Sequence, residues 1–263
     1  MNRVRCLCSV VAVLILATGC SGAEDVSQQN EQIDNNQGAL DQNAEPKQNP
    51  DKEKELSQTE VLAEIKKQID IYIPITLPEK LPLNKSDHLS ATTQSETNMY
   101  TVQFFVGPEP TPINNQALKN GSSDAKPLAR LTVHKYDTQK KADEEIAFQD
   151  FSQVGGQELD LGHNIIGYQD AGAGSLWTSW NEGRWALTSH TQTSRPVDGE
   201  QLARDTVEYL EKHTLPIPKQ HGYVHVDATG TNNRILWQKE STVYTLDQVD
   251  DPMIALKIAV MFK

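Results

Sequence analysis

One short segment constrains the fold of this chain more than any other, because two tryptophan-containing stretches flank a polar turn. Residues 176–180 (Leu-Trp-Thr-Ser-Trp) precede the polar turn 181–183, and residues 184–188 (Arg-Trp-Ala-Leu-Thr) follow it. Gly183 suits the left-handed position of a three-residue hairpin turn. The pattern predicts a β-hairpin, and with it a fold built on an antiparallel sheet.

Further segments continue this pattern on both sides of the hairpin. Alternating apolar residues predict more strands at residues 99–106, 128–136, 164–170, 234–238 and 243–246. Apolar residues at helical spacing, together with helix-start signals, predict helices from Ser57, over 138–151, over 198–213 and from Pro252 to the end. We therefore expect residues 57–263 to form a single α+β domain, in which a curved antiparallel sheet is covered by packed helices.

The second half of this domain contains a possible internal repeat. Residues 165–213 and 223–263 each contain a strand with a Trp near its end, a turn, a returning strand and a helix with Leu and Ala. The loops of the two copies differ in length. The pattern indicates one unit used twice.

All three cysteines lie within the first 20 residues. Arg3 and Arg5 precede an apolar run, residues 7–17, that is shorter than the ~20 residues needed to span a bilayer as a helix. Small residues then lead to Cys20. This order is typical of a signal peptide, residues 1–19. Alternatives are an ordinary signal peptide or a short anchor helix, with a cysteine at this position by chance.

The segment before Cys20 resembles the lipobox of bacterial lipoproteins, although Ala17 stands where that motif most often has Leu. The resemblance implies cleavage before Cys20 and a lipid on its sulfur. It implies a place on the outer face of the cell membrane, as expected of a lipoprotein of a Gram-positive bacterium. One thiol would remain after cleavage, so no internal disulfide could form, and the domain would depend on its core.

Residues 20–56 are rich in Gln, Asn, Asp and Glu. Such a stretch buries too little apolar surface to offset its chain entropy, so we predict a disordered tether. It would act as a spacer between membrane and domain; the alternative is a polar tail without a role. The whole chain has 24 basic and 36 acidic residues, a net charge of −12. This balance argues against nucleic-acid partners and against electrostatic docking on an anionic membrane.

A second resemblance concerns the C-terminal region. Trp237, Tyr244 and Leu246 follow the pattern Trp-x(6)-Tyr-x-Leu, and a terminal helix with Leu256 and Ala259 comes next. This resembles uncharacterised lipoprotein domains of Gram-positive bacteria, which are distantly similar to the lipoprotein-carrier and sigma-regulator fold. Over residues 71–263 the resemblance implies a curved sheet with helices and an apolar ligand. It brings no catalytic residues.

The candidate ligand-binding residues are aromatic. A groove for a glycan, peptide or acyl chain is predicted at Trp177, Trp180, Trp185 and Trp237, and the alternative places most of these rings in the core. His221 and His225 would lie ~13 Å apart along a strand, too far for one ion, so no metal site is predicted. No catalytic motif or cofactor-binding motif is recognised.

These observations favour a lipid-anchored extracytoplasmic protein with a non-catalytic binding or accessory role at the cell envelope. Its expected partners are the membrane, through the lipid on Cys20, and a protein, apolar or glycan ligand. A structural or interaction component of an envelope or sporulation complex is the second hypothesis. A hydrolase with an unrecognised site is the third, since folding can bring an acid and a base together.

Overall fold

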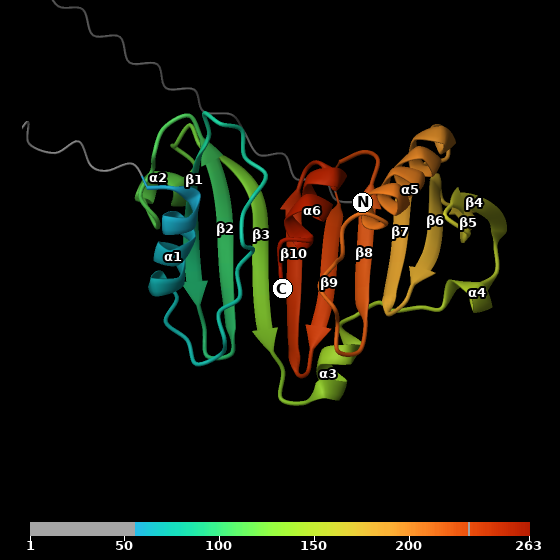
Figure 1. The fold of residues 1–263 in the computed structure, drawn as a ribbon, viewed down its shortest axis with the longest axis horizontal. Coiled ribbons are helices and arrows are strands. Elements are labelled where there is room, and N and C mark those ends of the chain that lie inside the picture. The colour runs from blue at the N-terminus through green and yellow to red at the C-terminus, as the bar shows by residue number, and fades with distance from the viewer. Residues whose placement is uncertain (1–55, 231) are drawn as a thin grey trace, which may run out of the picture. The chain divides into compact units, whose positions relative to one another are not determined.

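The computed structural model describes residues 56–230 and 232–263, and one open sheet dominates this part of the chain (Figure 1). Its ten strands lie in the order β1-β2-β3-β10-β9-β8-β7-β6-β5-β4. The pair β7–β8 is parallel and every other neighbouring pair is antiparallel. The strand bounds are β1 His88–Ser95, β2 Met99–Gly107, β3 Lys126–Lys135, β4 Gln157–Gly162, β5 Ile165–Gly172, β6 Ser175–Glu182, β7 Trp185–Gln192, β8 Gly222–Asp227, β9 Asn233–Lys239 and β10 Thr242–Val249.

The six helices of the described residues are short. Their bounds are α1 Gln58–Gln68, α2 Gln116–Lys119, α3 Gln139–Glu144, α4 Phe151–Val154, α5 Pro196–Leu210 and α6 Pro252–Ala259. None of these described helices has the length and apolar character required to cross a membrane.

The predicted α+β class, a curved sheet with packed helices, is wrong. The described residues are 38% strand and 23% helix, so the fold is dominated by its sheet. Two strands were missed: β1 carries mostly polar side chains, β4 has only two apolar ones, and both strands lie at the sheet edges. The helix predicted over 138–151 was overestimated. It ends at Glu144, after which Ile146 and Phe148 pack against the sheet without helical structure.

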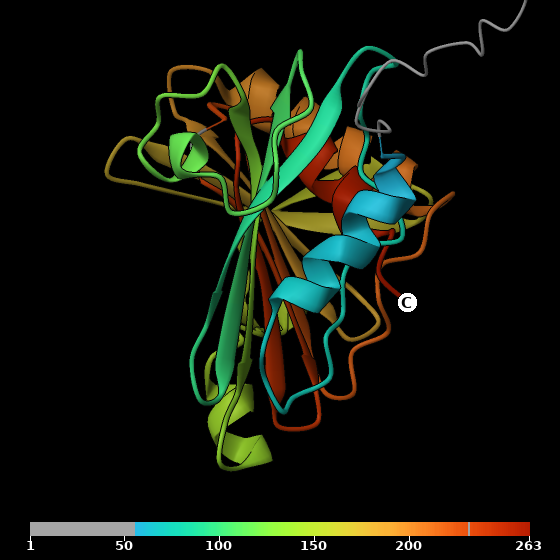
Figure 2. The ribbon, with the colours of Figure 1, turned by 90° about the vertical axis from the view of Figure 1, so that its left-hand side faces the viewer.

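The helices α1, α5 and α6 lie on one face of the sheet (Figures 1 and 2). Each contributes apolar side chains to a single core cluster, for example Ile65, Val207 and Leu256. The inward-facing strand residues include Trp180 and Trp237, both fully buried. We call this side of the sheet the covered face.

The opposite side, which we call the open face, carries far less apolar packing. Here α3 and the residues after it cover only the ends of β9 and β10, through Ala142, Ile146, Leu236 and Val243. Elsewhere the outward-pointing side chains are largely polar, as with Arg130 and Asp247, which form a bidentate ion pair across β3 and β10. The sheet therefore has an apolar side and a polar side.

Local signals in the sequence located several elements correctly. Ser57 and Glu60 form the predicted capping box at α1. Asp251 caps α6 before Pro252 at its first turn. The hairpin β6–β7 is confirmed, with Gly183 at φ +58° in its turn, but the predicted three-residue turn is wrong: Asn181 and Glu182 belong to β6, and the turn consists of Gly183 and Arg184. The predicted internal repeat stays a prediction, although β6–β7–α5 and β9–β10–α6 both place a helix after a hairpin.

The predicted signal peptide, Cys20 and residues 20–55 of the tether lie outside the described residues. The domain begins with α1, and an extended segment follows it, in which Ile73, Leu77 and Leu81 are buried. The Tyr100 hydroxyl fixes this segment to the sheet: it accepts a hydrogen bond from Thr76 N at 2.8 Å and donates to Thr76 O at 3.1 Å.

Candidate functional site

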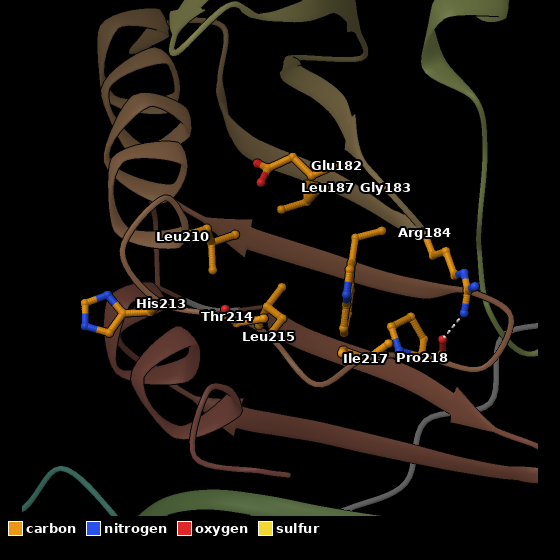
Figure 3. Close-up of a pocket in the computed structure, with 11 residues that line it drawn as sticks. Glu182, Gly183, Arg184, Leu187, Leu210, His213, Thr214, Leu215, Ile217 and Pro218 are labelled. Atoms are coloured by element: carbon orange, nitrogen blue, oxygen red, sulfur yellow. Dashed lines mark hydrogen bonds between the residues drawn. The ribbon is translucent and has the colours of Figure 1, made fainter.

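A pocket of about 310 Å³ opens on the covered face, beside the C-terminal end of α5. Figure 3 shows Leu210, Leu215 and Ile217 around it, with Arg184 at one end. Its walls come from the β6–β7 turn, the start of β7 and the segment that leads from α5 to β8. The lining residues are Glu182, Gly183, Arg184, Trp185, Leu187, Leu210, His213, Thr214, Leu215, Ile217 and Pro218.

The sequence after α5 explains why a hollow remains there. Pro216 and Pro218 cannot continue the helix, so the chain runs on in a non-helical conformation. Leu215 turns inward and is buried, whereas Ile217 is 75% exposed at the rim. This segment lines the pocket together with Trp185 and Leu187.

Trp185 forms the floor of this pocket because a glycine lies beneath it. Its cross-strand neighbour on β8 is Gly222. A Cβ atom added to Gly222 would lie only 2.5 Å from Cζ3 and 2.7 Å from Cδ2 of the Trp185 ring. The ring thus rests directly on the backbone of β8, which is possible only without a side chain at this position.

Glu182 is the principal polar group of the pocket. Its Oε1 accepts a hydrogen bond of 2.7 Å from Trp180 Nε1. Burial raises the pKa of the Glu182 carboxyl above its ordinary value; the Trp180 hydrogen bond opposes the rise, and the charge of Glu211 adds to it. A carboxyl group in this setting can accept a hydrogen bond from a ligand, and it is neutral over a wider pH range than an exposed one.

Arg184 closes the far end of the pocket, and its guanidinium group is hydrogen-bonded to the protein backbone. Its Nη1 donates to the carbonyl oxygens of Pro218 and Lys219, at 2.9 and 3.0 Å. These bonds tie the β6–β7 turn to the segment before β8. The guanidinium group therefore has a structural role and holds the walls at their spacing.

The four tryptophans predicted to bind a ligand do not share one groove. Trp180 and Trp237 are fully buried in the core, where Trp237 stacks on Tyr244 with ring centroids 5.1 Å apart. Trp185 lines the pocket, and Trp177 is half-buried on the open face. A ligand-binding role stays a prediction, and this geometry restricts it to Trp185 and Trp177.

A second group of titratable side chains lies close together on the open face and was missed in the sequence. His190 on β7 and Asp227 on β8 are cross-strand neighbours, with 3.1 Å between Nδ1 and Oδ2. The ring of His225 lies 6.0 Å from that of His190, and the Trp177 ring lies 5.6 Å away on the other side. We call His190, His225 and Asp227 the histidine cluster.

The surroundings of the histidine cluster perturb two of its groups. Desolvation lowers the pKa of His225, so its imidazole is largely neutral near pH 7. Burial opposes ionisation of Asp227, but hydrogen bonds from Thr229 and His190 outweigh it and hold the pKa of that carboxyl below its usual value. The cluster therefore combines a neutral imidazole with a buried carboxylate.

His221 and His225, which the sequence placed too far apart to share a metal ion, have different partners. His221 Nδ1 lies 3.0 Å from Asp143 Oδ1, and its ring stacks on Phe148. The signal that could have found the cluster is the connection β7–α5–β8. A strand, helix and strand in this order usually form a parallel pair, which would have brought His190 close to β8.

Comparison with known proteins adds no identification. No protein-family model matches the chain, and no curated protein or solved structure shows significant similarity to it. Function must therefore be inferred from the geometry of the described residues and from the sequence.

Proposed function

We propose that this protein is a lipid-anchored lipoprotein on the outer face of the cell membrane, where it binds a small ligand without catalysing a reaction. The anchor is inferred from the sequence around Cys20, which resembles a lipobox. The polar segment that follows would hold the domain away from the membrane. The binding role rests on the pocket of the covered face.

The single observation that carries the binding role is a cavity with apolar walls and one partly buried carboxyl group. Its volume of about 310 Å³ is at the lower end of the range typical of small-molecule sites. Trp185, Leu187 and Leu215 offer apolar contact, while Glu182 offers a hydrogen-bond acceptor. The ligand expected is therefore small and mainly apolar, with one donor group that can reach Glu182.

Charge also selects among such ligands. Glu182 and the neighbouring Glu211 give their end of the pocket a negative potential, whereas the positively charged Arg184 lies at the far end, where it is hydrogen-bonded to carbonyl oxygens. A carboxylate or phosphate placed beside Glu182 would be repelled. Neutral or cationic donor groups, such as a hydroxyl or an amine, are favoured.

The experiment uses N-phenyl-1-naphthylamine, a small neutral fluorescent probe with one N–H donor. Its emission is titrated against the wild type, Ile217→Asp and Val197→Asp. Ile217 and Val197 are matched, because they are exposed by 75% and 70%, but only Ile217 lines the pocket. A charge at the rim is expected to weaken binding roughly tenfold, about 1.4 kcal/mol, in Ile217→Asp alone.

Two outcomes would contradict the proposal. In one, the wild type fails to bind the probe at all. In the other, Ile217→Asp and Val197→Asp bind it equally well, which would mean that the probe adheres to surface apolar side chains and not to the pocket. Circular dichroism of both variants provides the control for folding.

A further inference from the structure

The histidine cluster lies on the open face, away from the pocket, and the binding role proposed above makes no use of it. Its three residues each offer one potential ligand atom, and all these atoms lie within 4.8 Å of one another. Two are imidazole nitrogens and the third is a carboxylate oxygen. They come from the neighbouring strands β7 and β8, so a rigid part of the sheet holds them together.

We propose that His190, His225 and Asp227 form a binding site for a zinc ion. Two imidazoles with one carboxylate are a ligand set that suits zinc and related first-row transition metals. Calcium and magnesium prefer oxygen ligands, which are too few here to hold them. The three protein ligands leave a fourth tetrahedral position for water or an external ligand.

The distances fit this assignment after a small adjustment. In a tetrahedral site with bonds of ~2.0–2.1 Å, neighbouring ligand atoms lie about 3.3 Å apart. The 3.1 Å between His190 Nδ1 and Asp227 Oδ2 is already close to this value. The widest separation, up to 4.8 Å, must shorten by about 1.5 Å. Rotation of the His225 ring can supply that movement, because this side chain is only partly buried.

Asp227 is positioned in advance for this role. It is 1% exposed, and its Oδ1 accepts hydrogen bonds of 2.7 Å from both the backbone N–H and the hydroxyl of Thr229. Its own backbone N–H donates to Asn233 Oδ1 at 2.9 Å. Oδ2 is thereby directed toward His190. Such bonds to a ligating carboxylate orient it and commonly raise metal affinity.

The accessibility of the histidines suits an ion that enters from solvent. The His190 side chain is 17% exposed, and its ring lies between those of Trp177 and His225. The aromatic ring of Trp177 limits solvent on one side of the cluster. An ion bound here would be reached from the open face and would not disturb the core.

The competing explanation is that His190 and Asp227 form an ordinary hydrogen-bonded pair and that His225 is simply their neighbour. Both explanations include the 3.1 Å contact. The two explanations differ in the role of His225, which contributes a ligand atom only if the cluster binds a metal ion. Substitution of His225 therefore separates them without breaking the pair.

The test measures zinc affinity by competition with a chromophoric chelator, using purified protein that carries no histidine tag and has been stripped with EDTA. The variants are His225→Ala and, as a matched control, His221→Ala, which removes a histidine four residues away that pairs with Asp143. One zinc ion per chain is expected to bind the wild type and His221→Ala equally. His225→Ala should lose roughly 100-fold in zinc affinity. Loss of a residue that only hydrogen-bonds to a metal ligand already weakens binding by up to about this factor, and His225 would be a ligand itself.

A second measurement covers the case in which a variant is poorly folded. Cobalt(II) substituted into the wild type should give the visible absorption bands of a four-coordinate ion, and Asp227→Asn should lose them while its circular dichroism stays native. Zinc should also raise the unfolding temperature of the wild type but not of His225→Ala. Failure of the wild type to bind zinc, or equal affinity in His225→Ala and His221→Ala, would overturn the proposal. Neither result affects the pocket on the covered face.

Discussion

The contact between Trp185 and Gly222 makes a sharp prediction, because it supports both the packing of β7 on β8 and the floor of the pocket. In Gly222→Ala the new methyl group would lie 2.5 Å from Cζ3 of the Trp185 ring. This is far inside van der Waals contact. The obstacle is a rigid ring and not the flexible end of a side chain, so either the ring or β8 must move.

Two opposing effects set the size of the change. Overpacking of this kind costs about 1–3 kcal/mol. Replacing a strand glycine by alanine returns about 0.5–1 kcal/mol through the entropy of the unfolded chain, because Gly222 does not require a positive φ. The free energy of unfolding should therefore fall by about 1–2 kcal/mol, which a domain stable by about 5–15 kcal/mol tolerates.

Urea unfolding followed by circular dichroism measures this change, with Gly172→Ala as the matched control. Gly172 also lies in a strand, and a Cβ atom there would meet nothing within 4 Å, so its variant should be as stable as the wild type or slightly more so. In a Trp185→Leu background the ring is absent, and Gly222→Ala should become neutral or stabilising. A destabilisation that persists in that background, or equal midpoints for the Gly222 and Gly172 variants, would refute the reasoning.

Three further predictions concern the pocket, the N-terminal segment and the anchor. Because burial raises the pKa of Glu182, the carboxyl gains a proton as the pH falls through that value and becomes a weaker acceptor. The probe, whose N–H is expected to reach Glu182, should then bind less tightly, and Glu182→Gln should give a binding profile that is flat with pH. A profile with the same slope in the variant would assign the effect to another group. Tyr100→Phe removes the acceptor of the Thr76 N–H, which should lower the free energy of unfolding by about 1–3 kcal/mol in urea titrations. An unchanged midpoint would mean that water replaces the hydroxyl. Cys20→Ala should move the protein from the membrane fraction to the medium and abolish incorporation of labelled fatty acid; retention of both would contradict the lipid anchor.

Those parts of the fold that depend on neighbouring residues could be predicted from the sequence. The hairpin β6–β7 follows from two tryptophan-containing stretches on either side of a polar turn and from Gly183, which adopts φ +58°. The starts of α1 and α6 follow from Ser57 and Asp251, whose side chains accept hydrogen bonds from the first turn of each helix. Each of these signals involves residues only a few positions apart, so tertiary packing did not have to be known.

The parts that could not be predicted depend on position within the whole sheet. β4, with the sequence Gln-Glu-Leu-Asp-Leu-Gly, is a short strand at a sheet edge, and its two leucines, which alternate with Glu158 and Asp160, are too few to identify a strand. The tryptophans posed the same difficulty. Trp180 and Trp177 occupy one strand and face opposite ways, and only the packing of helices on one side decides which ring is buried.

The histidine cluster shows most clearly why some features cannot be predicted from the sequence, because its existence depends on the register between β7 and β8. His190 and Asp227 are 37 residues apart, and the crossover through α5 implies parallel neighbours but not which residues face each other. A slip of one residue would place His190 beside Val226, which points into the core. The same register sets Trp185 over Gly222, where only a glycine fits. A steric requirement on the covered face thus fixes the alignment that brings the ligand atoms together on the open face, and a change at Gly222 that shifted this register would alter both sites at once.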